Sequence, residues 1–204
     1  MSSIRRAVIQ STGSYLPENI MTNHDLEKIV DTSDEWIQQR SGIKSRHVAA
    51  DGESSADMAI AAAKDALESG NIDPQSIDCI IVATTTPDQT FPSVAVKVQA
   101  ALDIPVGIAF DVQAVCTGFV YALSVANSFI VSGQAKNILV IGADKMTSIL
   151  NWEDRTTCVL FADGAGAVVL SAKDNEDRGI ISCHIHADGR YRDILYVDGG
   201  PSST

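Results

Sequence analysis

Hydrophobic and polar positions along the chain alternate between two periods, which predicts strands interleaved with helices. Continuous β-branched runs are typical of strands buried on both faces of a sheet, and they occur at 77–86 and 106–112. The clearest helical pattern begins at Ser54 or Ser55, carries alanine and leucine on one face, and ends at Gly70. The pattern predicts further strands at 5–17, 137–146, 164–173 and 179–188, and further helices at 22–30, 31–43, 91–102 and 117–133.

This order of elements predicts an α/β fold with a mainly parallel sheet and helices on both of its faces. Capping residues mark the ends of the predicted helices: Ser33 is the expected N-cap of the helix that ends at Gly42, and Ser93 follows Pro92 at the start of another. The helix at 117–133 is apolar nearly all round. We therefore expect it to be buried between layers, with a second sheet on its far side.

The last residues run out in glycine, proline and serine without a closing element. Two apolar strands are predicted just before them, and nothing follows that would cover those strands. We therefore interpret the chain as the N-terminal portion of a longer protein.

Composition narrows the class of function. The 204 residues are 45% hydrophobic, enough for a substantial core, and the formal net charge of −11 without a basic stripe argues against nucleic acid as a partner. No secretory signal and no apolar stretch of the ~18 residues that a membrane helix needs is found, so we expect a cytoplasmic protein. The cysteines are scattered without paired spacing, which favours reduced thiols over disulfides or zinc: Cys79, Cys116, Cys158 and Cys183.

Cys116 differs from the other cysteines because it lies between a predicted strand and a predicted helix. Unpaired amides and the positive end of the helix dipole would stabilise a thiolate there, and Gly118 would permit close backbone approach. An amide near such a turn would also suit the oxyanion of a thioester. The alternative is an inert buried cysteine that fills a gap in the core. We interpret Cys79, Cys158 and Cys183 as structural.

Four separated motifs together resemble the 3-oxoacyl-[acyl carrier protein] synthase III family, condensing enzymes of the thiolase superfamily. They occur in the family's order and spacing, from about Ile4 to the last residues: DTSDEWIQQRSGIKSRH, TTTPDQTFPSVAVKVQAAL, DVQAVCTGFVYAL and NWEDRTTCVLFADGAGAVVL. The resemblance implies the thiolase-like αβαβα layered fold. Residues 1–175 would form its N-terminal half, and residues 176–204 the beginning of a truncated C-terminal half.

The resemblance also implies an activity. Cys116 would accept an acetyl group from acetyl-CoA, and the acyl-enzyme would then condense with malonyl-acyl carrier protein with loss of CO2, which initiates fatty-acid synthesis. Acetyl-CoA would be a substrate, with no permanently bound cofactor and no metal. The implied partners are acyl carrier protein and, in a homodimer, a second copy of the chain.

The resemblance assigns the CoA site residue by residue. Trp36 would stack on the adenine, Arg155 would lie on the opposite face of that ring, and Arg40 would lie near the phosphates. Thr32 would form a hydrogen bond near the adenine, and Phe91 would reach across the dimer into the partner's acyl pocket. The alternatives are a half-buried helix residue for Trp36, solvated charges for the arginines, and plain core packing for Phe91.

Two departures from the family's pattern stand out. Ala162 occupies a position in the glycine-rich turn near the active site where the family usually has glycine. The family's catalytic histidine and asparagine, and its basic docking face for the carrier protein, belong to a second half beyond these motifs. None of the chain's histidines lies in the catalytic histidine motif: His24, His47, His184 and His186.

Two other functions remain open at this point. A hydroxymethylglutaryl-CoA synthase, a thiolase or a quinolone-type condensing enzyme would also use such a cysteine on the same fold. A non-catalytic thiolase-like fragment that depends on a partner chain belongs to a different class, because an exposed half-core would need another chain to cover it.

Overall fold

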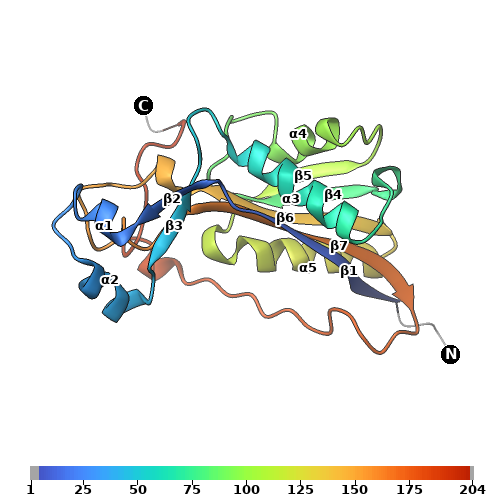
Figure 1. Cartoon of the computed structure of the whole chain (residues 1–204). Coiled ribbons are helices and arrows are strands. Elements are labelled where there is room, and N and C mark those ends of the chain that lie inside the picture. Colours follow the sequence, from blue (N-terminus) through green and yellow to red (C-terminus); the bar gives the residue numbers. More distant parts are fainter. Residues whose placement is uncertain (1–4, 203–204) are drawn as a thin grey trace.

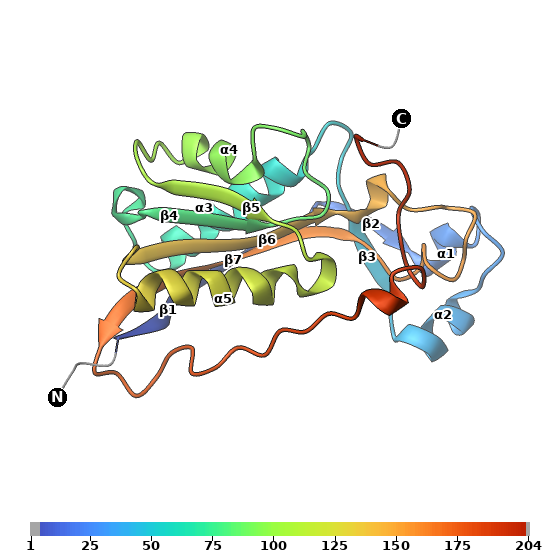
Figure 2. The same cartoon turned by 180° about the vertical axis from the view of Figure 1, so that it is seen from behind.

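A computed structural model describes residues 5–202 and shows one central sheet with helices on both faces (Figure 1). The sheet has five strands in the order β1-β7-β6-β4-β5. Its strands are β1 (Arg5–Tyr15), β4 (Cys79–Ala83), β5 (Ile108–Val112), β6 (Asn137–Lys145) and β7 (Asp163–Asp174). Helices α3 (Ser55–Ser69) and α4 (Val94–Ala101) cover one face, and α5 (Gly118–Val131) covers the other (Figure 2).

A smaller unit extends from one end of this sheet (Figure 1). It contains β2 (Asn19–Thr22) and β3 (Ser45–Val48), which pair in an antiparallel ribbon, together with the short helices α1 (Asn23–Leu26) and α2 (Asp34–Ser41). Single 3-10 turns complete the regular structure: η1 (Pro74–Ser76), η2 (Val115–Thr117), η3 (Met146–Ser148) and η4 (Gly189–Tyr191). The ribbon was not among the predicted strands, because its two arms are too short to carry a period.

A helix forms in each predicted range, although α1 covers only Asn23–Leu26 of the expected 22–30, and side-chain caps explain where α2, α3 and α4 begin. Ser33, Ser54 and Ser93 each accept a hydrogen bond from a backbone amide in the first turn of α2, α3 and α4. Gly42 ends α2 in the left-handed conformation that glycine adopts without a Cβ penalty. In α3, Asp57 completes a capping box with Ser54.

The sheet is mixed, which corrects the prediction of a mainly parallel sheet. β4 runs parallel to both β5 and β6, but β7 runs antiparallel to β6 and to β1. β1 runs through Gly13 and ends at Tyr15, inside the range 5–17 that the sequence predicted. β5 is an edge strand with partly exposed residues rather than a strand buried on both faces.

The strand predicted at 179–188 is absent from the described chain. Residues 175–202 instead form an extended segment that runs back beside α5 (Figures 1 and 2). Its amide at Ile180 donates to the Ala7 carbonyl of β1 at 2.9 Å. An apolar run becomes a strand only where a neighbouring edge supplies a full ladder of partners.

α5 is less enclosed than its composition predicted. Its sheet-facing residues Ala122, Ala126 and Ile130 are fully buried, whereas Val120 and Val131 are 42% and 53% exposed. The extended segment, and not a second sheet, contacts the far side of α5 in the described residues. The N-terminal half was predicted at 1–175 and the start of the C-terminal half at 176–204. Of these ranges, residues 1–4 and 203–204 lie outside the described residues.

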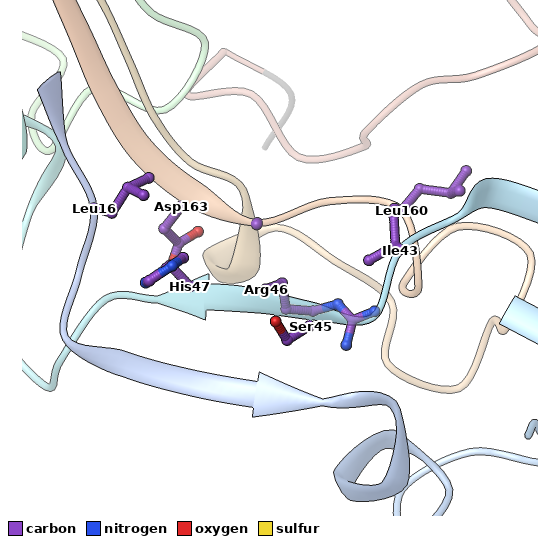
Figure 3. Close-up of a pocket in the computed structure, with 8 residues that line it drawn as sticks. Leu16, Ile43, Ser45, Arg46, His47, Leu160 and Asp163 are labelled. Atoms are coloured by element: carbon purple, nitrogen blue, oxygen red, sulfur yellow. The ribbon is translucent and has the colours of Figure 1, made fainter. Parts of the chain in front are cut away.

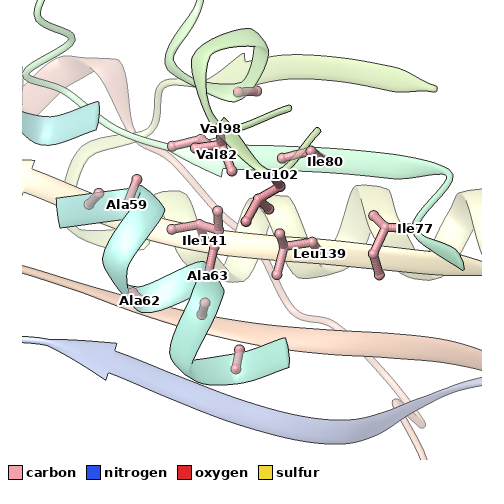
Figure 4. Close-up of a cluster of buried hydrophobic side chains, with 14 of the residues drawn as sticks. Ala59, Ala62, Ala63, Ile77, Ile80, Val82, Val98, Leu102, Leu139 and Ile141 are labelled. Atoms are coloured by element: carbon pink, nitrogen blue, oxygen red, sulfur yellow. The ribbon is translucent and has the colours of Figure 1, made fainter. Parts of the chain in front are cut away.

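The main core lies between the sheet and the α3–α4 layer (Figure 4). Alanines of α3 face larger side chains of the central strands, among them Ile80, Val82 and Ile141. Small residues on a helix let it approach a sheet closely, so the α3 alanines leave room for these larger side chains. Among residues 5–202, no helix is long and apolar enough to cross a membrane.

Loss of the α3 cap gives a first test of this fold. Ser54→Ala is expected to lower the free energy of unfolding by about 1 kcal/mol, because the Ser54 hydroxyl no longer accepts from the Asp57 amide or donates to the Asp57 carboxylate at the start of α3. Urea titration of the Ser54→Ala and Ser132→Ala variants measures the difference. Ser132 is the C-cap of α5, and its hydroxyl forms only exposed hydrogen bonds, with Phe129 and Gln134, so its variant serves as the control. An equal loss in both variants would contradict the capping argument.

Candidate active site

Cys116 is exposed and lies in the turn between β5 and α5. η2 (Val115–Thr117) carries it directly before the first residue of α5, Gly118. Because the thiol is exposed, Cys116 does not fill a gap in the core of the described chain, as the alternative expected. α5 begins on the side of the molecule toward α1 and α2 (Figures 1 and 2).

Gly118 lets the start of α5 approach the sheet closely. A Cβ at this position would lie 3.3 Å from Cβ of Ala83, at the carboxyl end of β4. The N-cap residue Thr117 donates its hydroxyl to the Ala114 carbonyl at 2.9 Å and does not accept from the helix. The first amides of α5 are therefore not capped by that side chain, which suits stabilisation of a neighbouring anion.

Val115, directly before Cys116, has a φ of +48°. This left-handed conformation is strained for a β-branched residue, and such strain persists only where the surrounding structure enforces it. Sequence reasoning missed Val115, because a valine after a strand looks like an ordinary apolar residue. The strained turn presents the following side chain outward, which agrees with the expected sharp turn from strand to helix.

The other thiols have different surroundings. Cys79 is buried at the start of β4, and burial raises the pKa of its thiol to about 12. Burial also raises the pKa of Cys158, which packs in the small unit with Leu26 and Ile37. Cys183 is half-buried in the extended segment and not in the expected strand. Cys116 is therefore the exposed thiol among the four.

The structure brings three of the predicted CoA-binding residues together. Cζ of Arg40 lies 4.7 Å from the centroid of the Trp36 ring, and Cζ of Arg155 lies 5.2 Å from it. Trp36 and Arg40 lie one turn apart on α2, while Arg155 comes from the loop between β6 and β7. A half-buried indole beside two exposed guanidinium groups offers flat faces and positive charge at one place.

Thr32 lies beside this cluster, in the loop before α2. Arg155 reaches the same loop, since its Nη1 donates to the Asp31 carbonyl at 2.9 Å. Oγ1 of Thr32 is buried, and no residue that the structure describes forms a hydrogen bond with it. A buried hydroxyl without a partner is costly, so it supports the expected hydrogen-bonding role for Thr32.

Phe91 is 81% exposed, at the loop between β4 and α4. It therefore does not pack in the core of the described chain, and the core-packing alternative is wrong there. A large aromatic side chain that projects this far is typical of a contact with another molecule.

A cavity of about 230 Å³ lies apart from these residues, beside β3 (Figure 3). Leu16, Arg46, His47 and Asp163 line it, as does Ala162, the departure from the family's pattern. Several polar groups in its wall form hydrogen bonds within the protein, although Nε of Arg46 is buried without a partner among the described residues. Asp163 accepts hydrogen bonds from Ala49 N and Thr147 N, and Arg46 donates to Asn23.

The glycine-rich motif is not a turn, which corrects the expectation for it. Gly164 and Gly166 lie within β7 and pair with Asp144 and Gly142 of β6. Among residues 5–202, no three His, Cys, Asp or Glu side chains gather in a group that could hold a metal ion.

Comparison with known proteins finds similarity to one family. A sequence model of 3-oxoacyl-[acyl-carrier-protein (ACP)] synthase III matches residues 110–189, which include Cys116 and Arg155. The chain is 61% identical over 202 residues to β-ketoacyl-[acyl-carrier-protein] synthase III of Rhodospirillum centenum, covering 98% of this chain and 62% of that protein. The enzyme of the same name from Paramagnetospirillum magneticum is 58% identical over 205 residues, covering 98% and 63%.

Solved structures give the same result. The synthase III of Thermus thermophilus matches with a TM-score of 0.88 and 43% identity, over 93% of this chain and 58% of that one. The synthase III of Aquifex aeolicus matches with a TM-score of 0.80 and 55% identity, over 83% and 55%. The chain thus spans about 62% of the length of the curated relatives it matches.

The mixed sheet, its helices and the thiol at the start of α5 define a thiolase-fold protein with a cysteine at the strand-to-helix turn. More narrowly, the chain is similar to members of the 3-oxoacyl-[acyl-carrier-protein] synthase III family over about 62% of their length.

Proposed function

We propose that the protein containing this chain is a condensing enzyme that starts fatty-acid synthesis from acetyl-CoA and malonyl-acyl carrier protein. The observation that carries the proposal is the exposed thiol of Cys116, which follows the strained Val115 and directly precedes α5. Two curated relatives named β-ketoacyl-[acyl-carrier-protein] synthase III are 61% and 58% identical over 98% of the chain.

The chemistry assigned to Cys116 is acyl transfer. Its thiolate attacks the thioester carbonyl of acetyl-CoA, the carbonyl electrons move to oxygen and return, and the CoA thiolate leaves with the C–S bonding pair. The carbanion formed when malonyl-acyl carrier protein loses CO2 then attacks the acetyl carbonyl. The thiolate of Cys116 is the leaving group, so the thiol returns unchanged. Amides at the start of α5 support the negative charge in both steps.

Acetyl-CoA would bind at the cluster of Trp36, Arg40 and Arg155. Purine rings stack on indole and guanidinium planes, and guanidinium groups pair with phosphates through parallel hydrogen bonds. The buried Thr32 hydroxyl would gain a hydrogen bond at the edge of the adenine. The long pantetheine arm of CoA would span from this cluster on the small unit to the turn at Cys116.

We also propose that the working enzyme is a homodimer in the cytoplasm. β5 has one neighbour in the described sheet, β4, so its other edge is available for a second chain. Phe91 projects beside this layer with 81% of its surface exposed, as a residue that enters a partner's acyl pocket would. Residues up to about 175 would form one thiolase-like half, and the extended segment would open the second half.

The test is CO2 release by the protein from the whole reading frame that contains this chain. Release from malonyl-acyl carrier protein is expected to require acetyl-CoA and to yield acetoacetyl-acyl carrier protein. A thiolase or a hydroxymethylglutaryl-CoA synthase would join acetyl groups without releasing CO2. Condensation of acetyl-CoA with no CO2 release would therefore contradict the proposal and favour one of those enzymes.

Loss of the Trp36 ring tests the CoA site separately. Trp36→Ala is expected to raise the acetyl-CoA concentration that gives half-maximal acylation of Cys116 about tenfold. This factor corresponds to the binding free energy lost with one stack of a base on an aromatic ring. Alkylation of Cys116 by iodoacetamide should keep its rate. Trp152→Ala is the matched control, because Trp152 packs on the same apolar cluster with no guanidinium stacked on it in the described chain. Equal effects in both variants would refute the stacking role.

A further inference from the structure

The loop that carries Phe91 is held by hydrogen bonds at both of its ends. It runs from the end of β4 to the start of α4, over residues 84–93. Loops with few internal bonds are mobile, and a mobile Phe91 would define no fixed boundary for a neighbouring pocket.

The first end of the loop is held by a partly buried carboxylate. Oδ1 of Asp144, in β6, accepts from the Thr85 amide at 2.7 Å and from the Thr86 hydroxyl at 3.2 Å. Ser55, at the start of α3, donates its hydroxyl to the Thr86 carbonyl at 2.7 Å. The loop therefore leaves the sheet in one direction.

The second end is held at the start of α4. Asp111 of β5 accepts from the amides of Val94 and Ala95, both at 2.8 Å, and so caps the helix from the neighbouring strand. This carboxylate fixes where α4 begins, three residues after Phe91.

Between these anchors, one ion pair crosses the loop. The ammonium group of Lys97, in α4, pairs with Oδ2 of Asp88, and both side chains are about three-quarters buried, with relative exposures of 24% and 22%. Hydrogen bonds from Ser54 lower the pKa of Asp57, and the positive charge of Lys97 lowers it further. Lys97 thus lies near a second carboxylate as well as Asp88.

We propose that Lys97 and Asp88 are positioning residues that set how far Phe91 projects and thereby limit the length of acyl group that the enzyme accepts. This inference rests on the proposed function, since it takes Phe91 as a wall of a partner's acyl pocket. Asp88 lies three residues before Phe91 and Lys97 six residues after it, so their ion pair closes the segment on which Phe91 stands. A pinned wall excludes longer chains, whereas a wall free to shift admits them.

The test uses Lys97→Met in the protein from the whole reading frame, with Asp88→Asn removing the same ion pair from the other side. Lys64→Met, on the exposed side of α3, is the matched control. Lys97→Arg should keep an ion pair with Asp88 and therefore the wild-type adduct ratio. Each protein is offered equal amounts of acetyl-CoA and hexanoyl-CoA, and mass spectrometry measures the ratio of the two adducts on Cys116. In Lys97→Met and Asp88→Asn, the share of the hexanoyl adduct is expected to rise at least about fivefold. This is less than the discrimination between substrates that one methylene group can give in an apolar pocket.

A second readout follows Phe91 without any activity. With 4-fluorophenylalanine incorporated, the fluorine resonance missing from Phe91→Leu identifies Phe91, and loss of the ion pair should shift and narrow it. If Lys97→Met and Asp88→Asn keep the wild-type melting temperature and also the wild-type ratio of hexanoyl to acetyl adducts, the inference is overturned. The proposed function would remain intact. If no protein, the wild type included, forms an acyl adduct, the proposed function is overturned and this inference with it. The fluorine resonance would still report whether the ion pair holds the loop.

Discussion

Serine in place of Cys116 is expected to abolish transfer of acyl groups from acetyl-CoA to the protein, by a factor of about 10³ or more. A hydroxyl at neutral pH is a far weaker nucleophile than a thiolate, and no histidine is shown in contact with position 116 among the described residues to activate one. Acylation is measured by intact mass after timed exposure to acetyl-CoA. The same substitution leaves the fold unchanged, because the side chain is exposed.

Cys183→Ser is the matched control for that result. Cys183 is half-buried in the extended segment, away from the start of a helix, and its loss is expected to leave acylation at the wild-type rate. If Cys116→Ser still accepts acetyl groups at the wild-type rate, or if Cys183→Ser loses acylation, the thiol at the start of α5 is not the acceptor.

Alanine in place of Gly13 is expected to cost about 3 kcal/mol or more of unfolding free energy, or to prevent soluble expression. A Cβ at this position would lie 2.1 Å from the Ala66 amide nitrogen and 2.5 Å from the Ala62 carbonyl oxygen. Both atoms belong to the backbone of α3, so no side chain can rotate away. β1 and the helix would have to separate, and the core between them would open.

Gly166→Ala is the control, because Gly166 lies across from Ser14 on the neighbouring strand. A Cβ there would meet the nearest atom, the Gly13 carbonyl oxygen, at 3.9 Å, which is ordinary contact. Urea midpoints of the two variants give the comparison. Equal stability of Gly13→Ala and Gly166→Ala would contradict the close approach of β1 and α3.

Gly13 also shows what the sequence could not supply. In the sequence it lies inside the strand predicted at 5–17, and nothing there signals that α3 (Ser55–Ser69) crosses the strand at this point. Local signals were reliable because they act through neighbours in the chain: Ser33, Ser54 and Ser93 cap the helices that they were predicted to cap. The antiparallel placement of β7 between β1 and β6 depends on long-range pairing, which no local period encodes.

In the candidate active site, too, the sequence could not supply the features that depend on contacts between distant segments. Trp36, Arg40 and Arg155 were assigned from the family resemblance, and the structure brings them within stacking distance across more than a hundred residues of sequence. Neither the strain at Val115 nor the ion pair of Lys97 with Asp88 has a sequence signal, because both arise from how distant segments meet. The prediction of a strand at 179–188 was wrong for a related reason. The segment donates one backbone hydrogen bond to β1, from Ile180 to Ala7, and does not pair with it as a strand.

The central claim is that the thiol of Cys116 accepts acyl groups, and differential alkylation of the unmodified protein tests it most directly. The protein is exposed to acetyl-CoA or to buffer, then briefly to iodoacetamide at neutral pH, and the labelled peptides are quantified by mass spectrometry. We expect iodoacetamide to label Cys116 faster than Cys183, and acetyl-CoA to block the label at Cys116 alone. Labelling of Cys116 that stays the same after acetyl-CoA treatment would contradict the account.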